Sequence, residues 1–190
     1  MINAELGHVK TLEEFYKEIR SQQEEAHGKD YCQQHDALQR LLKSGECKTY
    51  KELGTHQGGT AAAAMLCNPQ AIELVDSDIS RYNKFLKPLA EKYCKENNIK
   101  LTVLNTDSSG LGSLGLTCDL LLIDSYHRAF HMQKELDMHH NNVRKYIIAH
   151  DTHSVPELFH CLNNFGQQNG WEVIEQGKTN VGYTVLKKKG

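Results

Sequence analysis

The sequence predicts an α/β fold, a doubly wound and mostly parallel sheet preceded by N-terminal helices. From Thr49 onward, short apolar segments alternate with stretches of helical periodicity, as in sheets built from βαβ units. A glycine-rich segment separates the first of these strands from its helix, and aspartates and histidines directly follow several later strands. Because parallel strands end at the same edge of a sheet, we expect these polar residues to form one ligand site.

The individual elements follow from periodicity and from capping signals. Two helices are expected between residues 11 and 44, because Thr11 and Glu14 have capping-box spacing and apolar residues recur at helical intervals. Strands are expected near residues 49–55, 71–76, 100–104, 118–124, 145–150, 171–176 and 182–188. Helices near residues 58–67, 79–97, 127–142 and 154–168 lie between them. Pro88 falls inside the second of these helices and is expected to split it by opening a second half.

The composition is that of an ordinary globular chain. The 190 residues carry 22 Lys and Arg against 24 Asp and Glu, a net charge of −2, which argues against a nucleic-acid partner. With 39% hydrophobic and 24% charged residues, we expect one domain over residues 1–190, with 1–45 as a helical cap on an α/β core of 46–190.

Targeting signals and disulfides are not expected. The longest apolar runs, 61–67 and 118–124, are far shorter than the roughly 20 residues that a membrane-spanning helix needs. The first ten residues lack the apolar core of a secretory signal, so a cytoplasmic location without a membrane partner is expected. None of the six cysteines forms a C-x-x-C pair, and we expect reduced thiols.

The first strand-to-helix turn is a candidate ligand-binding segment. Gly54 allows a tight turn and a close approach of a ligand to the backbone. Gly58 and Gly59 open the next helix, whose N–H groups can meet a polar or anionic group. The alternative is an ordinary turn with glycines that serve only the backbone.

Two acids are candidates for binding a nucleoside. Asp76 ends the second strand about twenty residues after the glycine turn, where a carboxylate can accept hydrogen bonds from both ribose hydroxyls. Asp76 is therefore the first choice, whereas Asp78 could instead be the N-cap of the following helix. Asp107 follows the third strand and could accept from an adenine amino group or cap a short helix. The segment 110–115 reads G-x-G-x-x-G, but no helix follows it, which indicates a loop.

The fourth and fifth strands bring acids and histidines to the same edge. Asp124 and Asp151, with His150 as a third candidate donor, resemble a small divalent-metal site. Oxygen donors favour Mg²⁺, whereas His150 would shift the preference toward Mn²⁺, Fe²⁺ or Zn²⁺. The alternative for Asp151 is capping of the next helix. His139 and His140, at a polar helix end, are expected to be solvated.

These motifs together resemble the class I S-adenosylmethionine-dependent methyltransferases. The residues that carry the resemblance are Glu52-Leu53-Gly54-Thr55, Gly58-Gly59-Thr60, Val75-Asp76, Asp107, Leu122-Ile123-Asp124 with His127, and Ile148-Ala149-His150-Asp151-Thr152. They look most like the branch of the cephalosporin hydroxylase and the rhamnosyl O-methyltransferase. The resemblance covers about residues 45–190. It implies a Rossmann-like sheet of seven strands with the last strand antiparallel.

The resemblance also implies the roles of the site residues. The methionine end of S-adenosylmethionine would lie on Glu52, Gly54 and Gly58, and Thr55 and Gly59 would also belong to the cofactor site. Asp76 would hold the ribose and Asp107 would face the adenine. Asp124 and Asp151 would hold Mg²⁺ or Mn²⁺, although His150 stands where several metal-dependent relatives have an acid or an amide.

The function implied is methyl transfer to a hydroxyl of a small molecule or sugar. A metal on Asp124 would lower the pKa of that hydroxyl, and His127 or His153 would take its proton. One alternative is a hydroxylase-like relative in which His127, His150 and Asp151 gather a redox metal. Another is a catalytically idle adenosyl-binding or scaffold protein. A homo-oligomer stays open, because residues 1–45 could cover the cofactor or form a dimer contact.

Overall fold

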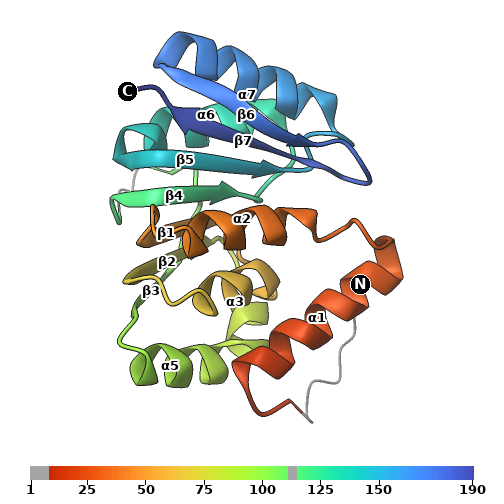
Figure 1. Ribbon diagram of the computed structural model, residues 1–190, viewed down its shortest axis with the longest axis vertical. Coiled ribbons are helices and arrows are strands. Elements are labelled where there is room, and N and C mark those ends of the chain that lie inside the picture. Colours follow the sequence, from red (N-terminus) through yellow and green to blue (C-terminus); the bar gives the residue numbers. More distant parts are fainter. Residues whose placement is uncertain (1–8, 111–114) are drawn as a thin grey trace.

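A computed structural model describes residues 9–110 and 115–190 (Figure 1). The strands are β1 (Thr49–Leu53), β2 (Ala71–Asp76), β3 (Lys100–Asn105), β4 (Cys118–Ile123), β5 (Val143–His150), β6 (Trp171–Gly177) and β7 (Tyr183–Lys188). They form one seven-stranded sheet of order β3-β2-β1-β4-β5-β7-β6. The first five strands in sequence are mutually parallel, and β7 runs antiparallel to both β5 and β6. The predicted fold class, including the antiparallel last strand, is confirmed.

The helices also follow the predicted pattern. They are α1 (Leu12–His27), α2 (Gln33–Lys43), α3 (Gly59–Met65), α4 (Ser80–Phe85), α5 (Lys87–Glu96), α6 (Ala129–His139), the 3₁₀ turn η1 (His140–Asn142) and α7 (Pro156–Asn169). The capping box at α1 is present, since the Thr11 hydroxyl accepts from the Glu14 N–H and the Glu14 carboxylate accepts from the Thr11 N–H. The helix expected over 79–97 is split into α4 and α5, with Pro88 in the first turn of α5. Across the described residues, no helix is long and apolar enough to cross a membrane.

The sheet separates two apolar layers. Leu120 and Leu122 of β4 pack into the layer that contains α1, α2, α3 and α5, whereas Leu121 and Ile123 pack against α6 and α7 (Figure 1). This alternation is the two-residue period of a strand. Phe15 of α1 is fully buried in the first layer, so the N-terminal helices share a core with the sheet.

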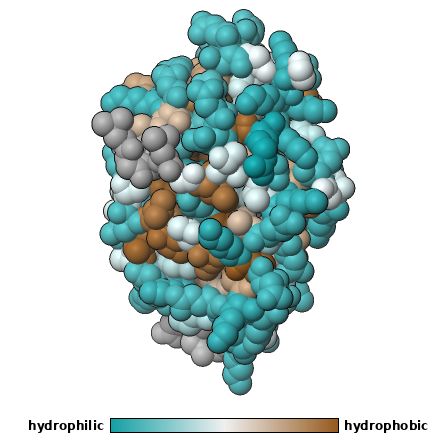
Figure 2. Space-filling model, turned by 90° about the vertical axis from the view of Figure 1, so that its left-hand side faces the viewer, coloured by the Kyte–Doolittle hydropathy of each residue, from teal (hydrophilic) through white to brown (hydrophobic). Residues whose placement is uncertain are grey.

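The strand register determines what lies at the carboxyl edge. Leu53 of β1 is paired with Val75 of β2 and with Ile123 of β4, and Ile123 is paired with Ala149 of β5. The residues that follow these positions therefore reach the same edge of the sheet. The opposite side of the molecule, on the left in Figure 1, is mostly hydrophilic with an apolar area, as Figure 2 shows.

Candidate active site

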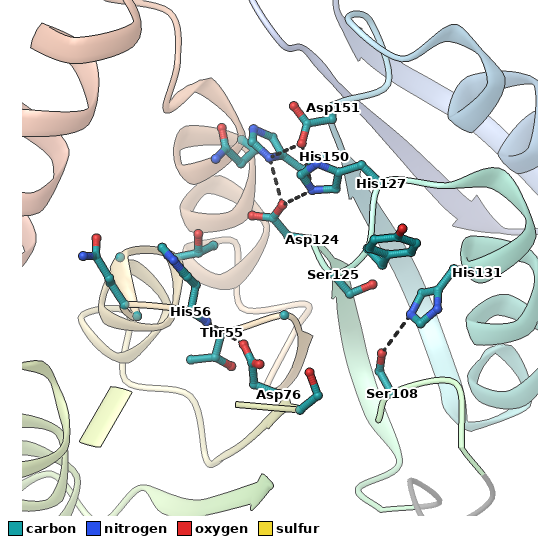
Figure 3. A pocket seen from close by; sticks show the side chains of 18 of the residues that line it. Thr55, His56, Asp76, Ser108, Asp124, Ser125, His127, His131, His150 and Asp151 are labelled. Atoms are coloured by element: carbon teal, nitrogen blue, oxygen red, sulfur yellow. Dashed lines mark hydrogen bonds and ion pairs between the residues drawn. The ribbon is translucent and has the colours of Figure 1, made fainter. Parts of the chain in front are cut away.

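A cavity of about 610 Å³ opens at the carboxyl edge of the parallel strands (Figure 3). Among the residues expected in the site, its lining includes Gly54, Thr55, Gly58, Gly59, Asp76, Asp107, Asp124, His127, His150 and Asp151. The remaining wall comes from the N-terminal helical region, from residues after β1, β2, β3 and β4, and from His131 of α6. The structure thus brings together nearly all of the predicted residues from five separate segments.

The glycines of the first turn are required by the protein's own backbone. Gly54 has φ +90°, and a Cβ atom there would lie 2.1 Å from the backbone oxygen of Asp124. Gly58 has φ +89°, and a Cβ atom there would lie 2.2 Å from a methyl carbon of Leu86. Both positions therefore exclude other residues even without a ligand. Both glycines also line the cavity, where their backbone is not covered by a side chain of their own.

Asp76 is fixed at the tip of β2 by backbone donors. One carboxylate oxygen accepts from the His56 N–H at 2.8 Å, and the other accepts from the Asp78 N–H at 2.9 Å. Asp78 itself accepts from the Ser80 N–H at 2.9 Å, although the N-cap residue of α4 is Ile79 and not Asp78. Each oxygen of Asp76 keeps a second lone pair for a ligand hydroxyl. Asp107 also lines the cavity, and one of its oxygens accepts from Ser109.

Asp124, His127 and Asp151 form a compact group of candidate metal ligands. One ligand atom from each lies within 4.8 Å of the other two. The His127 Nε2 atom is 3.2 Å from Asp124 Oδ1 and 2.9 Å from Asp151 Oδ2. Hydrogen bonds to the two carboxylates raise the pKa of His127 to about 10, so its imidazole is a cation at neutral pH. Figure 3 shows the three side chains pointing toward one another.

The electrostatics of Asp124 depend on both histidines. Burial alone would raise the pKa of Asp124, but the neighbouring His150 and His127 outweigh this and lower it well below its usual range. Asp151 has φ +58°, a conformation that is uncommon for a non-glycine residue and that occurs preferentially at functional sites. Two carboxylates are thus held together at the end of the cavity, with the imidazole of His127 within hydrogen-bond distance of both.

His150 lies behind this group. It is 4% exposed, and its Nδ1 atom is 3.0 Å from Asp124 Oδ1 and 3.4 Å from Asp151 Oδ2. Its ring meets the Tyr31 ring edge to face at 6.0 Å. His127, which the sequence indicated as a proton acceptor, therefore occupies the third position in the ligand group, and His150 braces Asp124.

Two of the expected site residues do not line the cavity. Glu52 is fully buried under the turn, its carboxylate accepts from the Tyr50 hydroxyl, and burial raises its pKa to about 8. His153 is not part of the lining, and its backbone N–H donates to the backbone oxygen of Val181 at 3.0 Å, which ties the chain after β5 to the β6–β7 hairpin. We therefore assign no contact with a ligand to Glu52 or to His153.

Sequence reasoning missed the contribution of the N-terminal cap and of α6. Gln34 of α2 is 2% exposed and lines the cavity together with Tyr31. A polar residue at a position that otherwise belongs to the buried face of α2 was the available signal. The expectation that His139 is solvated is wrong, since its side chain is 1% exposed. That face of α6 packs on the segment that follows β3, and His139 bonds to the backbone of Ser108.

Comparisons with known proteins support the fold. The sequence matches no protein-family model, and no curated protein matches it. Among solved structures, a candidate caffeoyl-CoA O-methyltransferase from Staphylococcus aureus is 12% identical, with a TM-score of 0.69 over 96% of this chain and 95% of that one. A methyltransferase from Geobacter sulfurreducens is 14% identical, with a TM-score of 0.64 over 83% of this chain and 79% of that one.

A methyltransferase from Podospora anserina with S-adenosylhomocysteine (SAH) bound is 16% identical, with a TM-score of 0.59 over 94% of this chain and 88% of that one. At these identities the similarity establishes the fold. The chain has the Rossmann-like fold of the class I methyltransferases.

Proposed function

We propose that the chain is an S-adenosylmethionine-dependent methyltransferase that acts on a hydroxyl oxygen of a small molecule or sugar. One observation carries the proposal. A single cavity joins the glycine turn and Asp76, which suit an adenosyl ligand, to the Asp124, His127 and Asp151 group, which suits an acceptor hydroxyl. The three solved structures compared above are methyltransferases, which supports the same reaction class.

The cavity fits the cofactor at its ribose end. Asp76 presents two carboxylate oxygens whose orientation is fixed by backbone donors, as the recognition of two vicinal hydroxyls requires. Gly54 and Gly58 in the lining offer backbone without a side chain to the ligand. Asp107 lines the cavity where the adenine amino group would lie. When bound, S-adenosylmethionine supplies an electrophilic methyl group on a sulfonium centre.

The donor set also fits a divalent cation. Carboxylate oxygens of Asp124 and Asp151 suit Mg²⁺ and Mn²⁺, and the imidazole of His127 shifts the preference toward Mn²⁺. A cation held there would lower the pKa of an acceptor hydroxyl. Without a cation His127 carries a proton at neutral pH, so it is not the resting proton acceptor. It would have to lose that proton to bind the cation through its ring nitrogen.

The other residues of the cavity wall orient the reactants and exclude water. Tyr31 and Gln34 close the cavity on the side of the N-terminal helices. Burial, together with Asp124 and Asp151, raises the pKa of Tyr31 to about 12, so its hydroxyl stays a hydrogen-bond donor. The described lining contains neither Lys nor Arg, which favours an uncharged acceptor over a phosphorylated one. Positioning of this kind can supply most of the rate of a displacement reaction.

The test is transfer of a labelled methyl group. The protein is incubated with methyl-labelled S-adenosylmethionine and panels of catechols, phenols and neutral glycosides, with Mn²⁺, with Mg²⁺ and with a chelator. We expect transfer to at least one hydroxyl class, and loss of transfer in Asp124→Asn while SAH binding persists. Binding of SAH without transfer to any hydroxyl would contradict the enzymatic role and favour an idle adenosyl-binding protein.

A further inference from the structure

Helix α6 presents a stripe of polar side chains to the interior. His131, Glu135 and His139 are spaced four residues apart and therefore lie on one face of the helix. Glu135 is fully buried and His139 is 1% exposed. Burial of a carboxylate is costly unless hydrogen bonds compensate it, so the partners of Glu135 indicate what this stripe does.

Glu135 connects two walls of the cavity. Its Oε1 atom accepts a hydrogen bond from the Ser125 hydroxyl at 2.6 Å and another from the Ser108 hydroxyl. Ser108 follows β3 and Ser125 follows β4, and both line the cavity. His131, also in the lining, places Nε2 3.4 Å from the Ser108 hydroxyl, as Figure 3 shows. One buried oxygen atom thus links two segments that reach the cavity from β3 and β4, strands that are separated in the sheet by β2 and β1.

The segment after β3 is held by further contacts from the protein interior. His139 Nε2 donates to the backbone oxygen of Ser108 at 2.8 Å, and burial lowers the pKa of His139 to about 4, so its ring is neutral. Near the start of β4, the Leu116 N–H donates to Glu73 Oε2 at 2.9 Å. A Cβ atom on Gly115 would lie 2.1 Å from the same carboxylate. Both described ends of this connection are therefore anchored on buried charged or polar groups.

We propose that Glu135 is a positioning residue that sets the width of the cavity between Ser108 and Ser125, and thereby the affinity for the nucleobase end of an adenosyl ligand. The inference rests on the proposed function, because Asp107, next to Ser108, is the residue proposed to face the adenine. A flat ring gains dispersion contacts on both faces only when the walls are correctly spaced, and a gap of a fraction of an ångström already loses much of that attraction.

The experiment measures ligand affinity by titration calorimetry. The probes are SAH and 5′-methylthioadenosine, which keeps the adenosine part and lacks the amino-acid part. Glu135→Leu should lower the affinity for both ligands by the same factor of about ten, because Ser108 and Ser125 lose the carboxylate oxygen that accepts from both of them. Glu135→Gln keeps an amide oxygen for the two serines and should restore affinity to within about threefold of the wild type. Asp137→Ala, at an exposed position on the same helix, is the matched control and should bind like the wild type.

A double-mutant cycle shows whether Glu135 acts through the cavity wall. If it does, Ser125→Ala alone weakens SAH binding. The loss of binding free energy in the double variant is then smaller than the sum of the losses in the two single variants. Thermal unfolding shows whether each variant is folded. If Glu135→Leu does not fold, the affinities of Glu135→Gln and Ser125→Ala decide the question. Unchanged SAH affinity in a folded Glu135→Leu variant, or strict additivity in the cycle, would overturn the proposal. Failure of the wild type to bind either probe would instead remove the proposed function, and this inference with it.

Discussion

Replacing Asp76 by alanine should weaken SAH binding by about two orders of magnitude. Both oxygens of the carboxylate are oriented by backbone N–H groups at 2.8 and 2.9 Å and each can accept one ribose hydroxyl. A hydrogen bond to a charged group contributes about 1.5–3 kcal/mol. Two bonds at the lower limit give about 3 kcal/mol, which corresponds to roughly 100-fold in affinity.

The assay is titration calorimetry with SAH, and Asp78→Asn is the matched control. Asp78 lies in the same connection and accepts from the Ser80 N–H, a bond that asparagine can keep. The backbone donors that Asp76 leaves unpaired, on His56 and Asp78, belong to exposed residues and can bond to water, so the melting temperature should change little. A decrease in affinity of less than threefold for Asp76→Ala would refute the assignment of Asp76 to the ribose.

Other predictions concern stability. Gly54→Ala should lower the free energy of unfolding by more than about 2 kcal/mol in urea, because a Cβ there meets backbone at 2.1 Å, whereas Gly45→Ala, at φ +81° with open space, should cost about 1 kcal/mol. His127 has a raised pKa of about 10, so its stabilisation relative to His127→Gln should be complete below about pH 6.5 and lost as the pH rises through 10. Since that side chain is 46% exposed, screening should limit the difference to about 1 kcal/mol, and a difference that grows with pH would contradict the ion pairs. Lys51→Met should destabilise by about 3–5 kcal/mol, because it leaves Glu73 buried without its partner at 2.8 Å, and adding Glu73→Leu should recover much of the loss in chemical denaturation.

The elements of the fold could be predicted because local signals and packing agree. Pro88 fixed the split between α4 and α5, since a proline is accommodated in the first turn of a helix and not in its interior. The residues after β2 and β4 could be placed at one edge because parallel register brings strand ends together. Asp76 and Asp124 accordingly line one cavity.

The parts of the site that escaped prediction depend on tertiary packing. The roles of Tyr31 and Gln34 follow from how α2 packs beside β5, and no local pattern specifies that contact. His139 lies at a polar helix end, which ordinarily faces water, but here its face of α6 packs on the connection after β3. His153 was expected near the acids, yet the turn after β5 directs it to the hairpin.

Calorimetric titration of the wild-type protein with SAH, with Mn²⁺ present and with a chelator, tests the central claim most directly. The cavity with Asp76 at its ribose end predicts saturable binding at one site per chain with a dissociation constant in the micromolar range. It also predicts that SAH still binds with the chelator, because Asp124, His127 and Asp151 lie outside the proposed ribose contact. The absence of a binding signal under every condition would contradict the assignment of the cavity to an adenosyl ligand.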